Sequence, residues 1–310
     1  MISTNKALSL VSKSVKEIGS EYIYTNNSLG RFLYTSIRAK INSPPFDMSA
    51  MDGYAVKLSK ADKTKKKIYK IINEVFAGDN VLCQIKDNEA VRIYTGGKLP
   101  KGANAIIIQE NVKKIDNKTF SCDEKTIFNQ YIRKKGKDFK NNKMLLKKGH
   151  KINARDIGLL ISSGIKKIKV YKKPNVILIA TGNELVKTKE SLSGSQIYAS
   201  SLYMLKNLLN IYGANCIKTK ILKDDEKVIK KYFSEIKNCD LIISTGGVSV
   251  GKKDLIIKSL EFIGFKKKFW KVSIKPGKPI LFGFYKNIPL FGLPGNSVST
   301  YVCFIIFVLE

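Results

Sequence analysis

The chain has 310 residues, of which 44% are hydrophobic and 26% charged, a composition typical of a globular protein with two or three domains. Its formal net charge is +31, from 56 Lys+Arg against 25 Asp+Glu, but arginine occurs only at positions 31, 38, 92, 133 and 155. Because nucleic-acid readers use arginine for bidentate contacts, we interpret the scattered lysines as a solvated surface that attracts anionic ligands, and we expect no nucleic-acid partner.

The five cysteines form no C-x-x-C pair, which argues against a disulfide framework or a zinc site and predicts a reducing compartment. His150 is the only histidine, so a multi-histidine metal site is excluded and a Ser-His-Asp triad would depend on that one residue. The N-terminal apolar run is too weak for a signal peptide, and the run at 302–309 is too short to span a bilayer. We therefore expect a soluble cytoplasmic protein with no membrane partner.

The first half of the chain predicts two kinds of structure. Apolar residues at helical spacing predict an amphipathic helix over residues 5–18, and residues 28–41 predict one or two strands. The stretch 44–137 alternates strand-like runs with glycine turns and has no convincing helical pattern. We expect a β-rich domain there, inserted into a partly helical connecting domain made of residues 1–43 and 138–171.

The second half alternates strands, loops and helices, including a predicted helix over 197–212. This order is typical of a three-layer α/β domain with a mainly parallel sheet, which we place at 172–310. The fold class is therefore α/β and multidomain. Functional loops gather at the carboxyl ends of parallel strands, so we expect the loops 181–185, 244–254 and 293–297 to lie along one rim.

The loop 244–254 has the features of an anion site. Gly246 and Gly247 follow a short apolar strand, and their permissive backbones allow N–H groups to close on a phosphate. Asp254 adds a carboxylate for a metal or a proton. The loop 293–297 lies at a helix N-terminus, where free N–H groups also favour an anion. An ordinary turn has the same local sequence, and the expected meeting of three loops is what favours a site.

A predicted strand over 269–275 supplies positive charge. Alternate side chains of a strand share a face, so Lys271, Ser273 and Lys275 are expected to point the same way. Two lysines on one face, close to a Pro-Gly turn, are suited to hold two negative groups. Solvent exposure of both lysines is the alternative.

Six sequence blocks carry a resemblance to one family. They occur in that family's order and cover nearly the whole chain, which is far more specific than a single glycine motif. On these blocks the chain resembles the molybdopterin molybdenumtransferases, of the MoeA and gephyrin E-domain type. The blocks are SPPFDMSAMDGYAV at 43–56, TGGKLP at 95–100, TGNEL at 181–185, TGGVSVG at 245–251, KPGKP at 275–279 and LPGN at 293–296.

The resemblance implies a reaction and an assembly. Members of this family take molybdate and adenylylated molybdopterin, hydrolyse the adenylate with Mg²⁺ and insert molybdenum to give molybdenum cofactor. They are homodimers whose site resembles a cleft between the α/β domain of one subunit and the β-rich domain of the other. The expected partners are thus a small pterin substrate, a second copy of the chain and other cofactor-biosynthesis proteins.

The resemblance also implies roles for individual residues, by their positions in the matching blocks. Asp138 and Asp225 are weaker candidates, the latter as an alternative to Asp224. Catalytic roles are implied for Asp52, Lys271, Lys275 and Asp254, and metal ligation for Glu184, Asp254 and Asp224. Substrate binding is implied for Thr95, Thr181, Gly182, Ser244, Thr245, Gly246, Gly247, Ser249, Gly251, Pro276, Lys278, Pro294, Gly295 and Asn296.

Three positions depart from the family pattern. Asn183 stands where an acidic residue is common, Lys252 where the family usually has Glu, and Ser297 where a proline follows Leu-Pro-Gly-Asn. The first two changes reduce negative charge and would weaken metal binding. The family normally continues beyond the point that corresponds to Glu310, into a small C-terminal β domain, so we expect that domain to be absent, either through truncation or because the protein manages without it.

Two other functions are compatible with part of the pattern. The adenylyltransferase of the same pathway is similar over 172–310, but it lacks the SAMDGYA block and the β-rich domain, which counts against it. A non-catalytic molybdopterin-binding or scaffold protein of the same fold is the remaining alternative.

Overall fold

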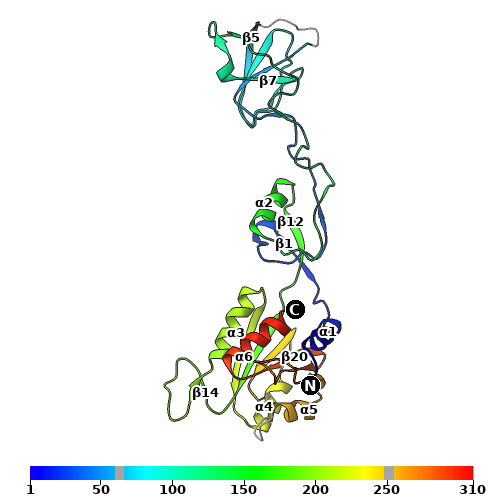
Figure 1. The fold of residues 1–310 in the computed structure, drawn as a ribbon, viewed down its shortest axis with the longest axis vertical. Helices are drawn as coiled ribbons and strands as arrows, with labels where there is room; N and C mark the ends of the chain where they lie inside the picture. The colour runs from blue at the N-terminus through cyan, green and yellow to red at the C-terminus, as the bar shows by residue number, and fades with distance from the viewer. Residues whose placement is uncertain (60–65, 248–254, 310) are drawn as a thin grey trace. The chain divides into compact units, whose positions relative to one another are not determined.

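The computed structural model describes residues 1–59, 66–247 and 255–309. The chain divides into two compact units. Figure 1 shows the fold with its helices and strands labelled. The first unit is made from two stretches, Met1–Glu21 and Val170–Glu310, and the second unit is Tyr22–Lys169.

A six-stranded sheet forms the centre of the first unit. Its strands are β13 (Asn175–Thr181), β16 (Asn215–Leu222), β17 (Leu241–Thr245), β18 (Lys266–Trp270), β19 (Leu281–Tyr285) and β20 (Ile288–Leu293). They lie in the order β16–β13–β17–β20–β19–β18. The first four strands are mutually parallel, β19 is antiparallel to β20, and β18 is antiparallel to β19. Every residue of β13 after Asn175 is buried, because a central parallel strand is covered on both faces. The predicted mainly parallel sheet is confirmed.

Helices cover both faces of this sheet. They are α1 (Thr4–Ser14), α3 (Ser200–Ile211), α4 (Glu226–Ser234), α5 (Leu255–Phe262) and α6 (Ser297–Cys303), which continues as a π-helical segment, Phe304–Val308. Leu178 belongs to a core with side chains of α1, α3 and α6, whereas Ile179 belongs to a second core with α4 and α5. Neighbouring strand residues point to opposite faces, so the two cores lie on opposite sides of the sheet. The three-layer prediction is confirmed.

A second six-stranded sheet lies in the second unit. Its order is β7–β4–β6–β5–β9–β8, and only the β5–β6 pair is parallel. In the described part of 44–137 the only helical element is a 3₁₀ turn, Gln109–Asn111, as the β-rich prediction requires. The strands are β4 (Gly53–Val56), β5 (Lys67–Val75), β6 (Glu89–Ile93), β7 (Ala105–Ile108), β8 (Lys113–Lys114) and β9 (Thr119–Cys122).

Short strand pairs and one helix complete the structure. Helix α2 (Ala154–Ser162) begins with a capping box in which Asn153 and Asp156 exchange hydrogen bonds. A 3₁₀ turn occupies Thr25–Asn27. The pairs are β1 (Ser20–Tyr24) with β12 (Lys167–Tyr171), β2 (Ile37–Arg38) with β11 (Met144–Leu146), β3 (Met48–Ser49) with β10 (Ile132–Arg133) and β14 (Leu185–Val186) with β15 (Ile197–Tyr198).

The predicted strand over 269–275 is wrong beyond Trp270. Strand β18 ends there, and Lys271 adopts a φ of 69°, in the left-handed region that breaks strand alternation. Lys271 and Lys275 therefore do not share a strand face. The positions of the two lysines are set by tertiary contacts and not by the alternation of side chains along a strand.

Three other predicted boundaries also move. The first helix ends at Ser14, because Val15 is already extended with ψ of 141°. The predicted helix over 197–212 begins at Ser200, after a short strand, and the strand character expected over 28–41 is limited to β2.

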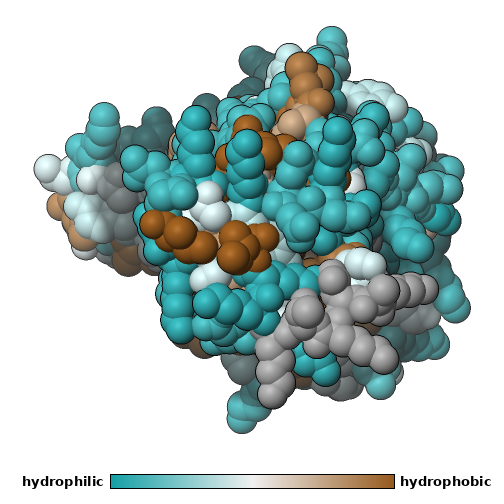
Figure 2. All heavy atoms as spheres, turned by 90° about the horizontal axis from the view of Figure 1, so that it is seen from above, coloured by the Kyte–Doolittle hydropathy of each residue, from teal (hydrophilic) through white to brown (hydrophobic). Residues whose placement is uncertain are grey.

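Hydrophilic side chains predominate on the face drawn in Figure 2, and hydrophobic ones form small separate patches. This is the distribution expected if most lysines are solvated. In the described ranges, no helix has both the length and the apolar character needed to cross a membrane.

Candidate functional site

A pocket of about 490 Å³ lies at the carboxyl ends of β13, β17 and β20. The described parts of the three predicted loops meet there along one rim, as expected. Of the predicted site residues, Thr181, Gly182, Glu184, Asp224, Thr245, Gly246, Gly247, Gly295 and Asn296 line it. Ser200, Ser201 and Ser297, together with residues of β14, β15 and the start of α3, complete the lining.

Glycine is required where β17 approaches β13. Gly246 has a φ of +80°, and a Cβ there would lie 2.5 Å from the carbonyl oxygen of Thr181. Gly247 has a φ of +64°, and its Cβ would lie 3.0 Å from the Thr181 hydroxyl. That hydroxyl donates to the carbonyl of Thr245 at 3.4 Å. Any larger residue at 246 would push the two strand ends apart, so this wall of the pocket consists largely of backbone.

Two carboxylates lie at the pocket. The Glu184 carboxylate folds over Gly182, where an added Cβ would lie 2.5 and 2.6 Å from its two oxygens. The backbone N–H of Asp224 donates to Asn183 Oδ1 at 3.1 Å, so Asn183 ties the loop after β13 to the loop after β16. A neutral amide serves this purpose as well as a carboxylate would, but it contributes no negative charge for a cation.

The donor set for a metal is therefore incomplete among the residues the structure describes. They contain no group of three or more His, Cys, Asp and Glu side chains able to hold an ion. Glu184 and Asp224 offer carboxylate oxygens, the ligand type that Mg²⁺ prefers. The third predicted ligand, Asp254, lies outside the described residues, as do Ser249 and Gly251.

Three serine hydroxyls gather on one side of the pocket. Ser297 Oγ lies 3.1 Å from both Ser200 Oγ and Ser201 Oγ, and Ser201 also donates to the carbonyl of Gly295 at 3.3 Å. Asn296 caps α6 by accepting from the N–H groups of residues 298 and 299. Ser200 and Ser201 were not predicted as site residues, because the helix was expected to begin at 197. Serine is favoured at helix starts, so this pair of serines was the available sequence signal.

Several predicted residues do not line this pocket. Lys275 and Lys278 are exposed, and the Lys271 ammonium lies 4.0 Å from the centre of the Trp270 ring. Ser244 is fully buried within β17. Pro294 faces α6, where its carbonyl accepts from the Thr300 hydroxyl at 2.6 Å.

The segment after Lys275 is held tightly against α6. Gly277, which follows Pro276, has a φ of +111°, and a Cβ there would lie 2.5 Å from Cys303 Sγ. The Cys303 thiol in turn donates to the Gly277 carbonyl at 3.5 Å. This contact fixes the backbone between Pro276 and Lys278 and leaves the lysine side chains in solvent.

The Asp52–Thr95 pair lies in the second unit. Asp52 Oδ1 accepts hydrogen bonds from both the backbone N–H and the hydroxyl of Thr95, each at 2.8 Å. These two bonds, with the positive charge of Arg92, hold the pKa of Asp52 below its ordinary value. Asp52 is therefore ionised at neutral pH and is prepared to accept a proton or a hydrogen bond.

Asp138 takes part in a separate cluster of the second unit. Its carboxylate accepts from Arg133 at 3.0 and 3.2 Å and from the Ser43 hydroxyl at 3.1 Å. A shallow pocket of about 480 Å³ is lined by residues 136–143, including Asp138. Since its carboxylate is already paired, Asp138 is better suited to shaping this loop than to holding a metal.

A mainly parallel α/β sheet with a pocket of glycine backbone, hydroxyls and carboxylates at the carboxyl ends of its strands has the arrangement in which open α/β proteins bind small molecules. The family model described as "MoeA N-terminal region (domain I and II)" matches residues 2–164, and the one described as "Probable molybdopterin binding domain" matches 177–310. The chain belongs to the MoeA family of enzymes, the molybdopterin molybdenumtransferases.

Individual relatives agree with this assignment. The chain is 37% identical to the molybdopterin molybdenumtransferase of Haemophilus influenzae, over 92% of this chain and 70% of the relative, and 31% identical to that of a Nostoc species, over 97% and 70%. A solved structure of the molybdopterin biosynthesis moeA protein from Pyrococcus horikoshii OT3 superposes with a TM-score of 0.84 at 30% identity, covering 100% of this chain and 78% of that one.

Proposed function

We propose that this chain inserts molybdenum from molybdate into adenylylated molybdopterin and releases AMP. The observation that carries the proposal is the pocket at the carboxyl ends of β13, β17 and β20, where residues from three of the six family blocks meet. Family membership supports the class of reaction. It also makes the non-catalytic alternative the less favoured one, because the relatives that match over most of the chain carry the name of the enzyme.

Each wall of the pocket suits a part of this substrate. The backbone at Gly246 and Gly247 can approach a phosphate closely, and the three serine hydroxyls can donate to its oxygens. Glu184 and Asp224, with Asp254, would hold Mg²⁺, which stabilises the charge that develops on phosphate oxygens. Lys271 and Lys275 are proposed to attract molybdate and the pyrophosphate.

We further propose that the active form is a homodimer. Asp52 and Thr95 belong to the second unit and the pocket to the first, and the family resemblance implies that the site is completed by a second copy of the chain. The pattern of strands and helices along the sequence supports three proposed domains, 1–43 with 138–171, 44–137 and 172–310. The cysteine pattern supports a proposed cytoplasmic location, and the resemblance supports contacts with other proteins of cofactor biosynthesis.

A direct assay tests the proposed reaction. Purified chain is incubated with adenylylated molybdopterin, Mg²⁺ and molybdate, and both AMP and cofactor are quantified. Molybdate-dependent release of AMP with formation of cofactor is the expected result. Tight binding of the adenylylated pterin without AMP release would instead favour the non-catalytic alternative.

A further inference from the structure

Arg92 is held in the second unit by neutral groups. Its guanidinium lies 4.8 Å from the centre of the Tyr54 ring and 5.1 Å from that of Tyr94, and it donates to Gln109 Oε1 at 2.5 Å. Tyr54 is buried, and Tyr94 stacks on Phe76 with ring centres 4.6 Å apart. Within the described ranges, no carboxylate forms an ion pair with Arg92. Its charge is thus fixed in place and not neutralised by a direct partner.

Strand register brings this charge next to Asp52. Strands β4 and β6 are antiparallel, with Tyr54 opposite Arg92. Asp52 immediately precedes β4, and Thr95 follows β6 by two residues, so their hydrogen-bonded pair lies at one end of the strand pair that carries Arg92. Gln109 joins the two, because its backbone N–H donates to the Asp52 carbonyl at 3.2 Å while its side chain accepts from Arg92.

We propose that Arg92 is a positioning residue for Asp52, which it holds through Gln109 and through its own unneutralised charge. The inference rests on the proposed function, in which Asp52 takes part in the reaction. Thr95 donates twice to Asp52 Oδ1, and no described residue donates to Oδ2. We therefore expect Oδ2 to be the oxygen that contacts the substrate, whereas Arg92 acts on Asp52 without touching the substrate.

Two carboxylates contact the side chains around Arg92. Glu110 accepts from Gln109 Nε2 at 3.2 Å, and Glu74 accepts from the Tyr94 hydroxyl at 2.8 Å. Arg92 is the cation that lowers the pKa of Asp52, after the two bonds from Thr95. Removing Arg92 removes this stabilising positive charge, so the pKa of Asp52 is expected to rise.

The test compares Arg92→Met, which keeps an apolar stem but removes the charge, with Arg92→Lys, which restores the charge. We expect Arg92→Met to lower kcat on the order of tenfold with KM changed by less than about twofold. The acid limb of the kcat–pH profile should move to higher pH. The Asp52 carboxyl ¹³C resonance, followed by NMR in the intact chain, should titrate at higher pH as well. Arg92→Lys should recover part of each change.

Lys167→Met is the matched control, because Lys167 also lies over a tyrosine ring of the second unit, 4.5 Å from the centre of Tyr24. Lys167→Met should leave kcat, the acid limb of the kcat–pH profile and the NMR titration of Asp52 unchanged. Gln109→Ala is the second variant if Arg92→Met does not fold, and it should move the acid limb in the same direction.

Different outcomes would contradict this inference and the proposed function. If Arg92→Met lowers the melting temperature and kcat but moves neither the acid limb nor the Asp52 titration, Arg92 only packs the tyrosines and the inference is wrong. An unchanged acid limb in Gln109→Ala overturns it as well. Full turnover in Asp52→Asn would instead remove Asp52 from the proposed reaction.

Discussion

Gly246 and Thr181 approach each other so closely that a Cβ on residue 246 would lie 2.5 Å from the Thr181 carbonyl oxygen. The contact joins the end of β17 to the end of β13 and forms the backbone wall of the rim pocket. Two parallel strands that neighbour each other can share such a wall only where a side chain is missing. The backbone wall of the pocket therefore requires a glycine at this position.

Gly246→Ala is expected to lower the free energy of unfolding by about 2–4 kcal/mol, because the new methyl group meets fixed backbone. Affinity for adenylylated molybdopterin should fall in parallel. Gly264→Ala is the matched control: its φ is +90°, but a Cβ there has no neighbour within 4 Å. Backbone strain alone should cost it about 1 kcal/mol. If urea unfolding showed the same loss of unfolding free energy in both variants, the steric argument would be contradicted.

Mixing two inactive variants tests the proposed homodimer. Asp52→Ala and Lys275→Ala are each expected to abolish turnover without unfolding the chain. If a site uses Asp52 from one copy and Lys275 from the other, a mixed dimer holds one intact site, and random reassortment should restore about a quarter of wild-type activity. No recovery after confirmed subunit exchange would place both residues in a site within one copy. Full activity in either single variant would remove that residue from the site.

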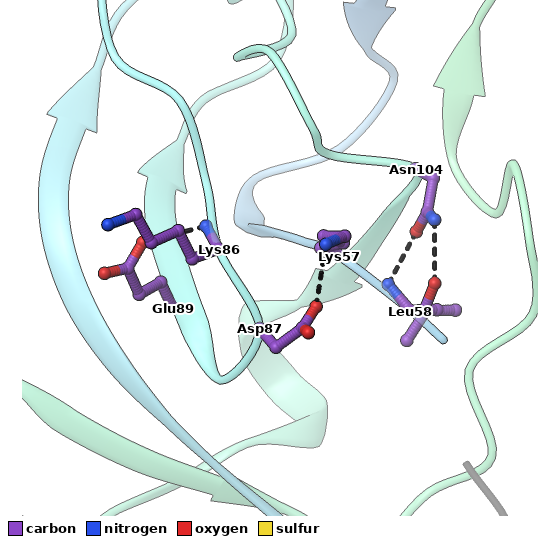
Figure 3. A network of polar contacts seen from close by, with 6 residues as sticks. All are labelled: Lys57, Leu58, Lys86, Asp87, Glu89 and Asn104. Carbon is purple, nitrogen blue, oxygen red and sulfur yellow. Dashed lines mark hydrogen bonds and ion pairs between the residues drawn. The ribbon is translucent and has the colours of Figure 1, made fainter. Parts of the chain in front are cut away.

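Asn104 closes the end of β4 with a pair of side-chain bonds. Its Oδ1 accepts from the Leu58 N–H at 2.8 Å and its Nδ2 donates to the Leu58 carbonyl at 2.9 Å (Figure 3). Asn104→Ala should cost about 2 kcal/mol in the free energy of unfolding, since both half-buried backbone groups lose a partner. The nearby Lys57–Asp87 ion pair, at 2.9 Å, is largely exposed, so Asp87→Asn should change stability by less than about 0.5 kcal/mol. Chemical denaturation of both variants provides the comparison.

Asp156 should make stability depend on pH. Burial raises the pKa of Asp156, but the Asn153 N–H at 2.9 Å and His150 at 2.6 Å outweigh it, so the pKa lies below its ordinary value. A carboxylate with a depressed folded-state pKa stabilises the fold above its unfolded-state pKa of about 3.9 and loses this contribution as pH falls through the folded-state value. Asp156→Asn should therefore lower the free energy of unfolding by about 1–2 kcal/mol at pH 7, and by less below about pH 4.

The control for this pH dependence is Asn153→Ala, which removes the other half of the capping box without removing a titrating group. It should cost about 1 kcal/mol with little change between pH 4 and 7. A constant gap between wild type and Asp156→Asn across this range and below it would show that the carboxylate charge contributes nothing.

Local patterns determined the architecture of the first unit. The apolar runs that became β13, β17 and β20 are too short for helices, and helices alternate with them, so a parallel sheet with its loops on one rim followed from general rules. Glycines at 246, 247 and 295 marked the pocket, because a glycine next to a strand end is itself a local signal.

Only the tertiary structure determined which side chains contact one another at the site. Lys271 follows a strand, but its left-handed backbone, set by the contacts of residues 271–280, removes it from any strand face. Ser200 and Ser297 meet at 3.1 Å across 97 residues of sequence, and Arg92 meets Gln109 across 17. Periodicity and turn signals act over a few residues, whereas such contacts depend on how whole elements pack. The type of site could thus be inferred from the sequence, and the partners of its side chains could not.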